Sequence, residues 1–287
     1  MPVNRGPATA VDYTAIGHVT IDVLADGSRR AGGTAFYSAL QAARLGRSAR
    51  IVTQGVPSEI EALLAPFAGE FELEIRPASA TTTLLTVGSG LVRRQRVLAW
   101  AGPIEEPVNV DSTVVHLAPI ARETPGRFAG RAGFVGLTPQ GLVREWAADD
   151  GEIALMGFSD EALAGVPERC DAIVLSDREL PTCAGFLAGA VGGGAIAAVT
   201  AEAAPTRLLL PDDRGLAVEV PSIEEPVDDL GAGDVFAAAF FLTLADGRSP
   251  QDAAAFATAA AAVRIKSDGA GAIGTLAAIE ARLRAVG

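Results

Sequence analysis

Residues 226–244 read PVDDLGAGDVFAAAFFLTL, which places small residues and a carboxylate directly before a long apolar run. We expect this run to form a helix that begins near Gly231. Glycines let backbone N–H groups approach a ligand closely, and the first turn of a helix attracts anions through its unpaired N–H groups and its dipole. Beside a phosphoryl group bound there, the Asp234 carboxylate would take a proton from an attacking hydroxyl. Asp234 would equally suit a structural role, because a carboxylate stabilises the positive end of a helix.

The elements that would position this turn alternate along the first 220 residues. Strand-like runs read YTAIGHV, ARIVTQG, STVVHLA, AGFVGLT, DAIVLS, AIAAVT and LAVEV. Helices are predicted at Thr34–Leu45, Ser58–Phe67, Gly141–Ala148, Pro181–Ala190, Gly231–Ala245, Pro250–Ile265 and Thr275–Val286. This alternation predicts an α/β fold with a mostly parallel central sheet and helices on both faces. Ligands of such sheets bind beyond the carboxyl ends of the strands.

Residues 78–102 do not fit this layered pattern. They contain two strand-like runs around a turn at Gly88–Gly90, with Arg93–Arg96 in the returning strand. We expect a β-hairpin that covers the ligand site as a lid or flap and is inserted within a single domain of residues 1–287. Because an exposed flap edge can pair with a second copy of the chain, a homodimer is compatible with this arrangement.

The composition limits the partners and the compartment. The net charge of −12 argues against nucleic acid, because phosphate backbones repel an acidic surface, but it leaves anionic small molecules open. Cys170 and Cys183 have neither metal-site spacing nor a disulfide framework, which favours a reducing cytoplasm. The uncharged run Leu180–Ala201 is divided by the glycines of VGGGA, so it predicts a helix, a turn and a strand rather than a membrane span. The N-terminus lacks the apolar core of a signal peptide, and we expect a cytoplasmic protein.

Four motifs together resemble the PfkB carbohydrate kinases, the ribokinase-like family. DDLGAGDVF at Asp228–Phe236 is similar to the family's C-terminal signature, Asp-Thr-Thr-Gly-Ala-Gly-Asp-x-Phe, and GGTAFYSALQAARLG at Gly32–Gly46 resembles its N-terminal signature. IGHVTID at Ile16–Asp22 resembles the family's first strand, and SDRE at Ser176–Glu179 stands where the family has Asn-x-x-Glu. The motifs follow the family's order over most of the chain. The resemblance implies a ribokinase-like α/β fold and an ATP-dependent kinase that uses Mg2+.

The resemblance also implies roles for individual residues. Asp234 would be the catalytic base, the backbone of Gly231, Ala232 and Gly233 would form the anion hole, and Glu179 would organise Mg2+ through water. The substrate-binding candidates are Asp22, Gly32, Gly33, Tyr37, Arg96 and Gln140. The nucleotide-binding candidates are Ser176, Thr200 and Asp228. Phosphoryl transfer needs mainly positioning and charge neutralisation, so these roles are chemically sufficient.

The chain departs from the family pattern on the nucleotide side. Where the family has Thr-x-Gly-x-x-Gly, the chain reads TAEAAP, with Glu202 and Pro205 in place of the glycines. Glu202 would bring a negative charge towards the phosphates, which predicts a weak affinity for nucleotides. The segment between Asp22 and Gly32 is short, so we expect that the part of the lid built there is nearly absent.

The acceptor remains open between two classes. RRQRVL and TPQGLVR together are similar to a branch of the family with inositol kinase-like members, and Gln140 and Arg144 suit the recognition of hydroxyls. A sugar, cyclitol or related small polyol is therefore the first choice of acceptor. A nucleoside is the alternative, because Phe36 or Tyr37 could stack on a base. A third reading is a catalytically weak member that binds a ligand, suggested by the missing glycines.

Overall fold

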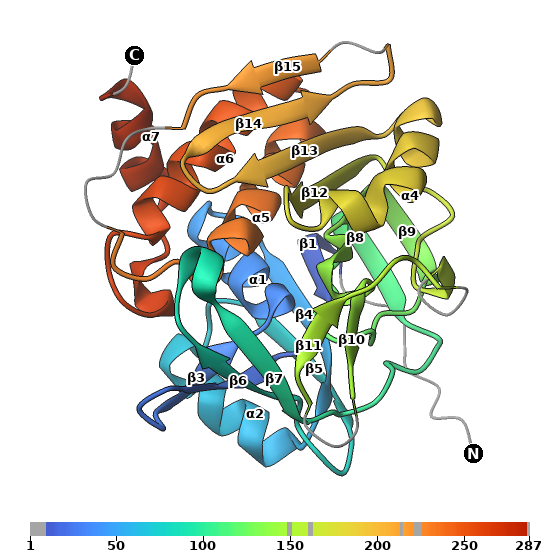
Figure 1. Ribbon diagram of the computed structural model, residues 1–287, viewed down its shortest axis with the longest axis vertical. Helices are drawn as coiled ribbons and strands as arrows, with labels where there is room; N and C mark the ends of the chain where they lie inside the picture. The colour runs from blue at the N-terminus through green and yellow to red at the C-terminus, as the bar shows by residue number, and fades with distance from the viewer. Residues whose placement is uncertain (1–9, 148–150, 160–162, 213–214, 221–225, 286–287) are drawn as a thin grey trace.

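The chain is built on a nine-stranded central sheet. The computed structural model describes residues 10–147, 151–159, 163–212, 215–220 and 226–285. The strands of the sheet are β1 (Val11–Ile16), β4 (Ala49–Gly55), β5 (Glu72–Pro77), β8 (Asn109–Leu117), β9 (Ala129–Leu137), β12 (Ala172–Ser176), β13 (Ile196–Ala201), β14 (Ala204–Leu209) and β15 (Gly215–Val218). Their order is β15-β14-β13-β12-β9-β8-β1-β4-β5 (Figure 1). The strands from β13 to β5 are parallel to their neighbours, and β14 and β15 are antiparallel.

Helices cover both faces of this sheet. They are α1 (Thr34–Arg44), α2 (Pro57–Leu64), α4 (Leu180–Gly192), α5 (Ala232–Ala245), α6 (Pro250–Arg264) and α7 (Leu276–Arg284), with short 3-10 helices η1 (Ala65–Phe67), η2 (Gly90–Val92), η3 (Pro139–Gly141) and η4 (Ala270–Ala272). Successive strand residues point to opposite faces, so Ala15 joins the core that contains α1, α5 and α6, and Ile16 joins the core that contains α4. Both faces are apolar, as parallel sheets require. The predicted α/β class is confirmed.

A second sheet of four strands stands apart from the first. It has the order β3-β2-β6-β7 and consists of β2 (Thr20–Leu24), β3 (Arg29–Gly32), β6 (Thr83–Val87) and β7 (Arg94–Ala99) (Figure 1). The expected hairpin is present as β6 and β7, which pair antiparallel. We call these four strands the flap sheet. A small antiparallel pair, β10 (Arg144–Trp146) with β11 (Ile153–Leu155), accompanies it.

Three expectations from the sequence are corrected here. The predicted helix at Gly141–Ala148 is wrong, because residues 144–146 pair with β11 as a strand. A short apolar run does not distinguish a helix from a strand by its periodicity, and here the pairing partner decided. The segment between Asp22 and Gly32 does build part of the lid, since β2 and β3 fit into it as two short strands. Asp22 itself therefore lies in the flap sheet and not at the end of β1.

The flap sheet is attached to the loop that precedes α5. In this loop the Asp229 carboxylate accepts a hydrogen bond from the backbone N–H of Gly90 (2.9 Å) and forms an ion pair with Arg93. On the β3 side, Arg30 forms an ion pair with Asp228 (3.1 Å). The hairpin therefore lies at the start of α5, where the sequence predicted the chemistry. Within the described residues, no helix combines the length and the apolar character needed to span a membrane.

Candidate active site

The first turn of α5 is shaped by Gly231. This residue caps the helix in the left-handed conformation, with φ of 78°, and a Cβ added to it would lie 2.4 Å from the ring of Tyr37. Only glycine combines this backbone angle with this close approach at little cost. Ala232, Gly233 and Asp234 follow in the first turn. The N–H of Ala232 donates to the carbonyl oxygen of Asp229 (3.2 Å), so the predicted place of Ala232 in the anion hole is corrected, and the N–H groups of Gly233 and Asp234 belong to the set that a helix start leaves without an intrahelical partner.

Asp234 carries a perturbed carboxyl group. The pKa of Asp234 is raised to about 6, mainly because burial among protein atoms disfavours the charged form. A hydrogen bond with the Thr34 side chain and the charge of Arg144 act in the opposite direction, towards a lower pKa. A carboxylate with a pKa near neutrality is well matched to accept a proton from a hydroxyl at physiological pH.

A chain of hydrogen bonds connects Asp234 to Gln140 and Arg144, the residues that the sequence suggested for recognition of substrate hydroxyls. The Gln140 amide donates to the Thr34 hydroxyl (2.8 Å), and its oxygen accepts from the Arg144 guanidinium (3.3 Å). Arg144 also donates to the side-chain oxygen of Gln95 in the flap sheet (3.0 Å). The structure thus connects Gln140 to Asp234 through Thr34 and places Arg144 beside Gln140 and Gln95.

Four carboxylates surround the Arg144 guanidinium electrostatically: Glu179, Asp234, Glu123 and Asp22. Burial lowers the pKa of Arg144, and the four acidic groups oppose this effect. These acidic groups come from four different parts of the fold: β2, the loop after β8, the residue before α4, and α5. The described hydrogen bonds of Arg144 go to Gln140, Gln95 and the carbonyl oxygen of Ile120.

Asp22 lies deep in the site with only 4% of its surface exposed. Its carboxylate accepts a hydrogen bond from the Thr20 hydroxyl (2.8 Å), and burial raises its pKa. A Cβ on Gly32 would lie 2.1 Å from a carboxylate oxygen of Asp22, so a glycine is needed for Asp22 to occupy this position. Gly33 follows as the residue that caps α1. Gly32 thus makes room for the Asp22 carboxylate, and Gly33 makes room for the backbone of His18.

Glu179 is the acidic residue at the start of α4. It is 9% exposed, and its carboxylate accepts a hydrogen bond from the backbone N–H of Ser176 (2.7 Å). Burial raises the pKa of Glu179, and the Ser176 hydrogen bond and Arg144 oppose that rise. Among the residues that the structure describes, no group of three or more His, Cys, Asp or Glu could hold a metal ion. The single carboxylate of Glu179 is still compatible with Mg2+, which is commonly bound by one or two carboxylates together with waters and substrate phosphates.

Arg96 does not lie on the site side of the flap. Side chains alternate along β7, where Gln95 is half-buried and contacts Arg144, and Arg96 is exposed on the opposite face. The prediction that Arg96 binds substrate is therefore corrected. The neighbouring Arg93 pairs with Asp229, and its charge lowers the pKa of Asp22.

The aromatic candidates for base stacking are buried. Phe36 is 0% exposed and makes edge contacts with the rings of Phe67 and Phe71, and Tyr37 is 2% exposed beneath Gly231. Neither ring offers a free face to a base, so the expected stacking is corrected. Tyr37 instead supports the first turn of α5 from below.

The nucleotide-side candidates divide into two groups. Ser176 and Thr200 are paired neighbours at the ends of β12 and β13, and both are half-buried. Asp228 differs, because its carboxylate is already engaged by Arg264 (2.8 Å) and by the backbone N–H groups of Leu230 (3.0 Å) and Gly269 (3.0 Å). Burial alone would raise the pKa of Asp228, but these bonds outweigh it and lower the pKa well below its usual range. Asp228 shapes the loop and leaves no carboxylate oxygen open for a nucleotide.

The TAEAAP segment forms a tight turn between β13 and β14. Ala201 pairs with Ala204 across the turn, and Glu202 has a positive φ of 45°. The Glu202 carboxylate lies 3.9 Å from the guanidinium of Arg178. A Cβ added to Gly90 would lie 3.6 Å from the same carboxylate of Glu202. The tip of the flap therefore approaches both this turn and Asp229.

Arg93, Gln95, Thr34 and Arg264 are members of the site that the sequence did not single out. Alternation along the returning flap strand is the signal that separates Arg93 and Gln95 from Arg96, but it requires the register of the strand. Thr34 follows directly after the paired glycines, which is the only sequence signal for it. Arg264 stands at the end of an alanine-rich helix, and no motif marks it.

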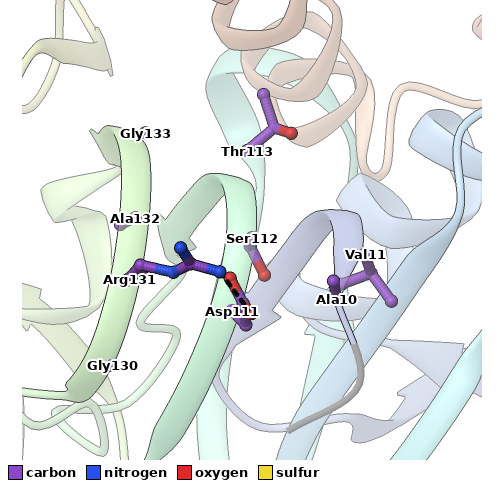
Figure 2. A pocket seen from close by; sticks show the side chains of 9 residues that line it. All are labelled: Ala10, Val11, Asp111, Ser112, Thr113, Gly130, Arg131, Ala132 and Gly133. Atoms are coloured by element: carbon purple, nitrogen blue, oxygen red, sulfur yellow. Dashed lines mark hydrogen bonds and ion pairs between the residues drawn. The ribbon is translucent and has the colours of Figure 1, made fainter.

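A hollow at the other end of the sheet is unrelated to these residues. It is lined by Ala10, Val11, Asp111, Ser112, Thr113, Gly130, Arg131, Ala132 and Gly133 (Figure 2). Val11 begins β1, so the hollow lies toward the amino ends of the strands, and the Asp111–Arg131 ion pair (3.1 Å) crosses it. Ligand sites of this sheet type lie at the carboxyl ends, where Ser176 and Thr200 are found.

Comparisons with known proteins agree with this arrangement. A family model described as pfkB family carbohydrate kinase matches residues 186–276, which include Asp228 and the first turn of α5. No curated protein matches the sequence. The chain is similar to a sulfate complex of a pyrophosphate-dependent kinase in the ribokinase family, with a TM-score of 0.72, 21% identity and coverage of 94% of this chain and 99% of that one.

Two further solved structures have comparable similarity. One is a pyrophosphate-dependent kinase in the ribokinase family complexed with a pyrophosphate analog and myo-inositol (TM-score 0.68, 21% identity, 90% of this chain and 96% of that chain). The other is the Arabidopsis thaliana ribokinase complexed with ribose and ATP (TM-score 0.70, 17% identity, 96% of this chain and 99% of that chain). The described chain thus has the ribokinase fold, and the family match over residues 186–276 confirms the resemblance to the PfkB carbohydrate kinases.

Proposed function

We propose that the protein is a kinase that transfers a phosphoryl group to a hydroxyl of a sugar, cyclitol or related small polyol. The observation that carries this proposal is Asp234, a carboxylate with a pKa of about 6 in the first turn of α5, connected through Thr34 to the polar residues Gln140 and Arg144. The family match and the fold support a carbohydrate kinase.

The residues of the site divide the reaction between them. Asp22 and Gln140 hold hydroxyls of the acceptor, with Thr20 positioning Asp22 and Arg144 positioning Gln140. Asp234 takes the proton of the attacking hydroxyl. The N–H groups of Gly231 and Gly233 stabilise the charge on the phosphoryl group in transfer, which is where fixed dipoles contribute most. Glu179 would hold Mg2+ through water, and the ion would supply neutralisation of the charge on the donor phosphates.

The burial of Phe36 and Tyr37 favours a polyol over a nucleoside as acceptor. The groups that surround Asp234 are carboxylates, an amide and a guanidinium, which bind hydroxyls rather than the flat face of a base. One relative of similar fold is complexed with myo-inositol, a cyclitol, which is compatible with this choice.

The donor has two candidates. ATP is implied by the family resemblance. Inorganic pyrophosphate is the second candidate, and the turn at Glu202 favours it, because this turn has a carboxylate where the family pattern has a glycine. Pyrophosphate needs only phosphate contacts, whereas ATP also needs space for its base and ribose. Two of the structures with similar folds are pyrophosphate-dependent kinases.

A panel of acceptors with each donor tests the proposal. Sugars, cyclitols and nucleosides are incubated with Mg2+ and either ATP or pyrophosphate, and phosphorylated product is measured. Transfer to a polyol or cyclitol is the expected result. Transfer only to nucleosides would contradict the acceptor class. The absence of transfer to every acceptor, with ligand binding retained, would support a binding protein without catalysis.

The donor is decided in the same assay with Glu202→Gly. If the carboxylate at this turn excludes nucleotides, the variant gains ATP-dependent turnover and the wild type prefers pyrophosphate. The Arg178→Gln variant is the matched control, since it removes the partner of Glu202 and leaves the carboxylate. Efficient use of ATP by the wild type, unchanged in Glu202→Gly, would show that the missing glycine has no effect on the donor.

A further inference from the structure

We infer that Arg264 is a positioning residue of the anion hole, a tethered cation that fixes the loop before α5 and adds positive charge beneath the bound phosphate. This inference rests on the proposed function, because it assigns a role within the same site. Nothing in the motifs points to it, since Arg264 lies 30 residues after Asp234 at the end of α6.

The Arg264 guanidinium is enclosed by oxygen atoms. Its side chain is 0% exposed, and it donates to the carbonyl oxygens of Asp228 (3.3 Å), Leu230 (2.7 Å) and Ser267 (3.1 Å) and to the carboxylate of Asp228 (2.8 Å). Three of these four oxygens belong to the two residues Asp228 and Leu230. A buried cation is stable only when it is paired and hydrogen-bonded, and the loop provides both.

This network reaches the first turn of α5 by two routes. The first route is the backbone, because the carbonyl of Leu230 belongs to the peptide bond that contains the N–H of Gly231. The second route is Tyr37, whose ring lies 5.6 Å from the Arg264 guanidinium carbon and directly beneath Gly231. Arg264 thus holds both the chain that enters the turn and the ring that supports it.

Two cations lie beside Asp228 at this loop. Two guanidinium groups, those of Arg30 and Arg264, face the single buried carboxylate of Asp228. The second acidic partner of Arg30, Asp268, is 80% exposed, so water screens its charge. The Arg264 guanidinium lies next to the N-terminus of α5, where its charge acts in the same direction as the dipole of the helix.

Arg44 provides a matched control. Its guanidinium also donates to carbonyl oxygens of a loop, those of Ala270, Gly271 and Ile273, and it forms an ion pair with Glu70 (3.0 Å). It makes no contact with the loop before α5 among the described hydrogen bonds. Loss of Arg44 removes a similar number of hydrogen bonds without touching the anion hole.

The test compares Arg264→Met with Arg44→Met. The affinity for inorganic pyrophosphate in the presence of Mg2+ is measured by calorimetry, and the melting temperature is measured in parallel. We expect Arg264→Met to bind pyrophosphate at least about tenfold more weakly than wild type, equivalent to about 1.4 kcal/mol. Arg44→Met should lower the melting temperature and leave pyrophosphate affinity unchanged. In Arg264→Ala, guanidinium ion at about 10 mM, too dilute to act as a denaturant at its usual molar range, should restore part of the affinity.

Several results would overturn the inference. One is a folded Arg264→Met that binds pyrophosphate as wild type does. Another is an equal loss of affinity in Arg44→Met, which would indicate a general effect of stability. If Arg264→Met does not fold, Arg264→Lys decides, because it keeps the charge but loses the fork; unchanged affinity in this variant would refute the positioning role. Binding of pyrophosphate without any phosphoryl transfer would contradict the proposed function but not this inference, whereas a wild type that binds neither pyrophosphate nor ATP would contradict both.

Discussion

At the residue scale, the site depends on a difference between Asp234 and the other buried acidic residues in pKa and in hydrogen-bond partners. Asp22 and Glu179 are buried and accept hydrogen bonds from Thr20 and from the N–H of Ser176. Asp228 is fully engaged by Arg264 and backbone N–H groups, which lower its pKa. Asp234 alone combines a pKa of about 6 with a place in the first turn of α5. Burial and hydrogen-bond partners therefore give Asp228 a structural role and leave Asp234 able to accept a proton.

The raised pKa of Asp234 predicts the pH dependence of catalysis. Only the ionised carboxylate accepts a proton, so kcat/KM for the acceptor should be level above pH 6 and fall about tenfold per pH unit well below it. Thr34→Val removes a hydrogen bond that lowers the pKa of Asp234, so the inflection should move to higher pH. A rate profile that stays flat down to pH 4.5, or an inflection that Thr34→Val leaves in place, would contradict this role.

Substitution of Gly231 should lower the free energy of unfolding for two separate reasons. Gly231→Ala places a side chain at positive φ, which costs about 1–2 kcal/mol, and adds a clash with the Tyr37 ring. Gly247→Ala is the matched control, because Gly247 has φ of 82° and no atom within 4 Å of the added Cβ. Urea unfolding should show a larger loss of stability for Gly231→Ala. Equal losses in the two variants would show that the contact with Tyr37 has no energetic effect.

At the element scale, the flap sheet and the loop before α5 are connected directly. The family signature has threonine after its first aspartate, and this chain has Asp229, which binds Gly90 and Arg93 of the flap. A partly exposed ion pair contributes only about 0.2–1 kcal/mol, so it favours the closed position of the flap by a modest factor. Closure of such a flap excludes water from the phosphoryl group.

This connection predicts different effects for two arginines of the same segment. Arg93→Gln should increase hydrolysis of the donor in the absence of acceptor and lower kcat/KM, because the flap loses its contact with Asp229. Arg96→Gln should change both quantities little, since Arg96 is exposed on the other face of β7. The two assays use the same donor and measure released phosphate. Equal behaviour of the two variants would show that the contact with Asp229 does not govern closure.

At the scale of the whole molecule, the sequence predicted the layers better than the contacts. The alternation of strands and helices placed most elements of the central sheet and α1, α4, α5 and α6, because burial on both faces leaves a strong apolar pattern. The glycine motifs located Asp22 and Asp234, since close backbone approach restricts these positions to glycine. The local sequence was sufficient to locate a position wherever the backbone conformation or a close contact required glycine.

Long-range pairing explains what the sequence could not predict. The register of β7, which turns Arg96 outward and Gln95 inward, is set by its pairing with β6 and by an irregularity between Thr83 and Leu84. The strand at residues 144–146 exists because β11 pairs with it. Arg264 reaches the loop before α5 only through the packing of α6 on α5. A homodimer remains a prediction.

The central claim is that Asp234 is the base of a phosphoryl transfer, and turnover of Asp234→Asn tests it most directly. The amide keeps the size of the side chain but cannot accept the proton. We expect turnover of the preferred acceptor to fall by at least ~100-fold, the usual scale of general base catalysis, while acceptor affinity and the melting temperature stay close to those of the wild type. Turnover within a few-fold of the wild type in a folded Asp234→Asn variant would contradict the account.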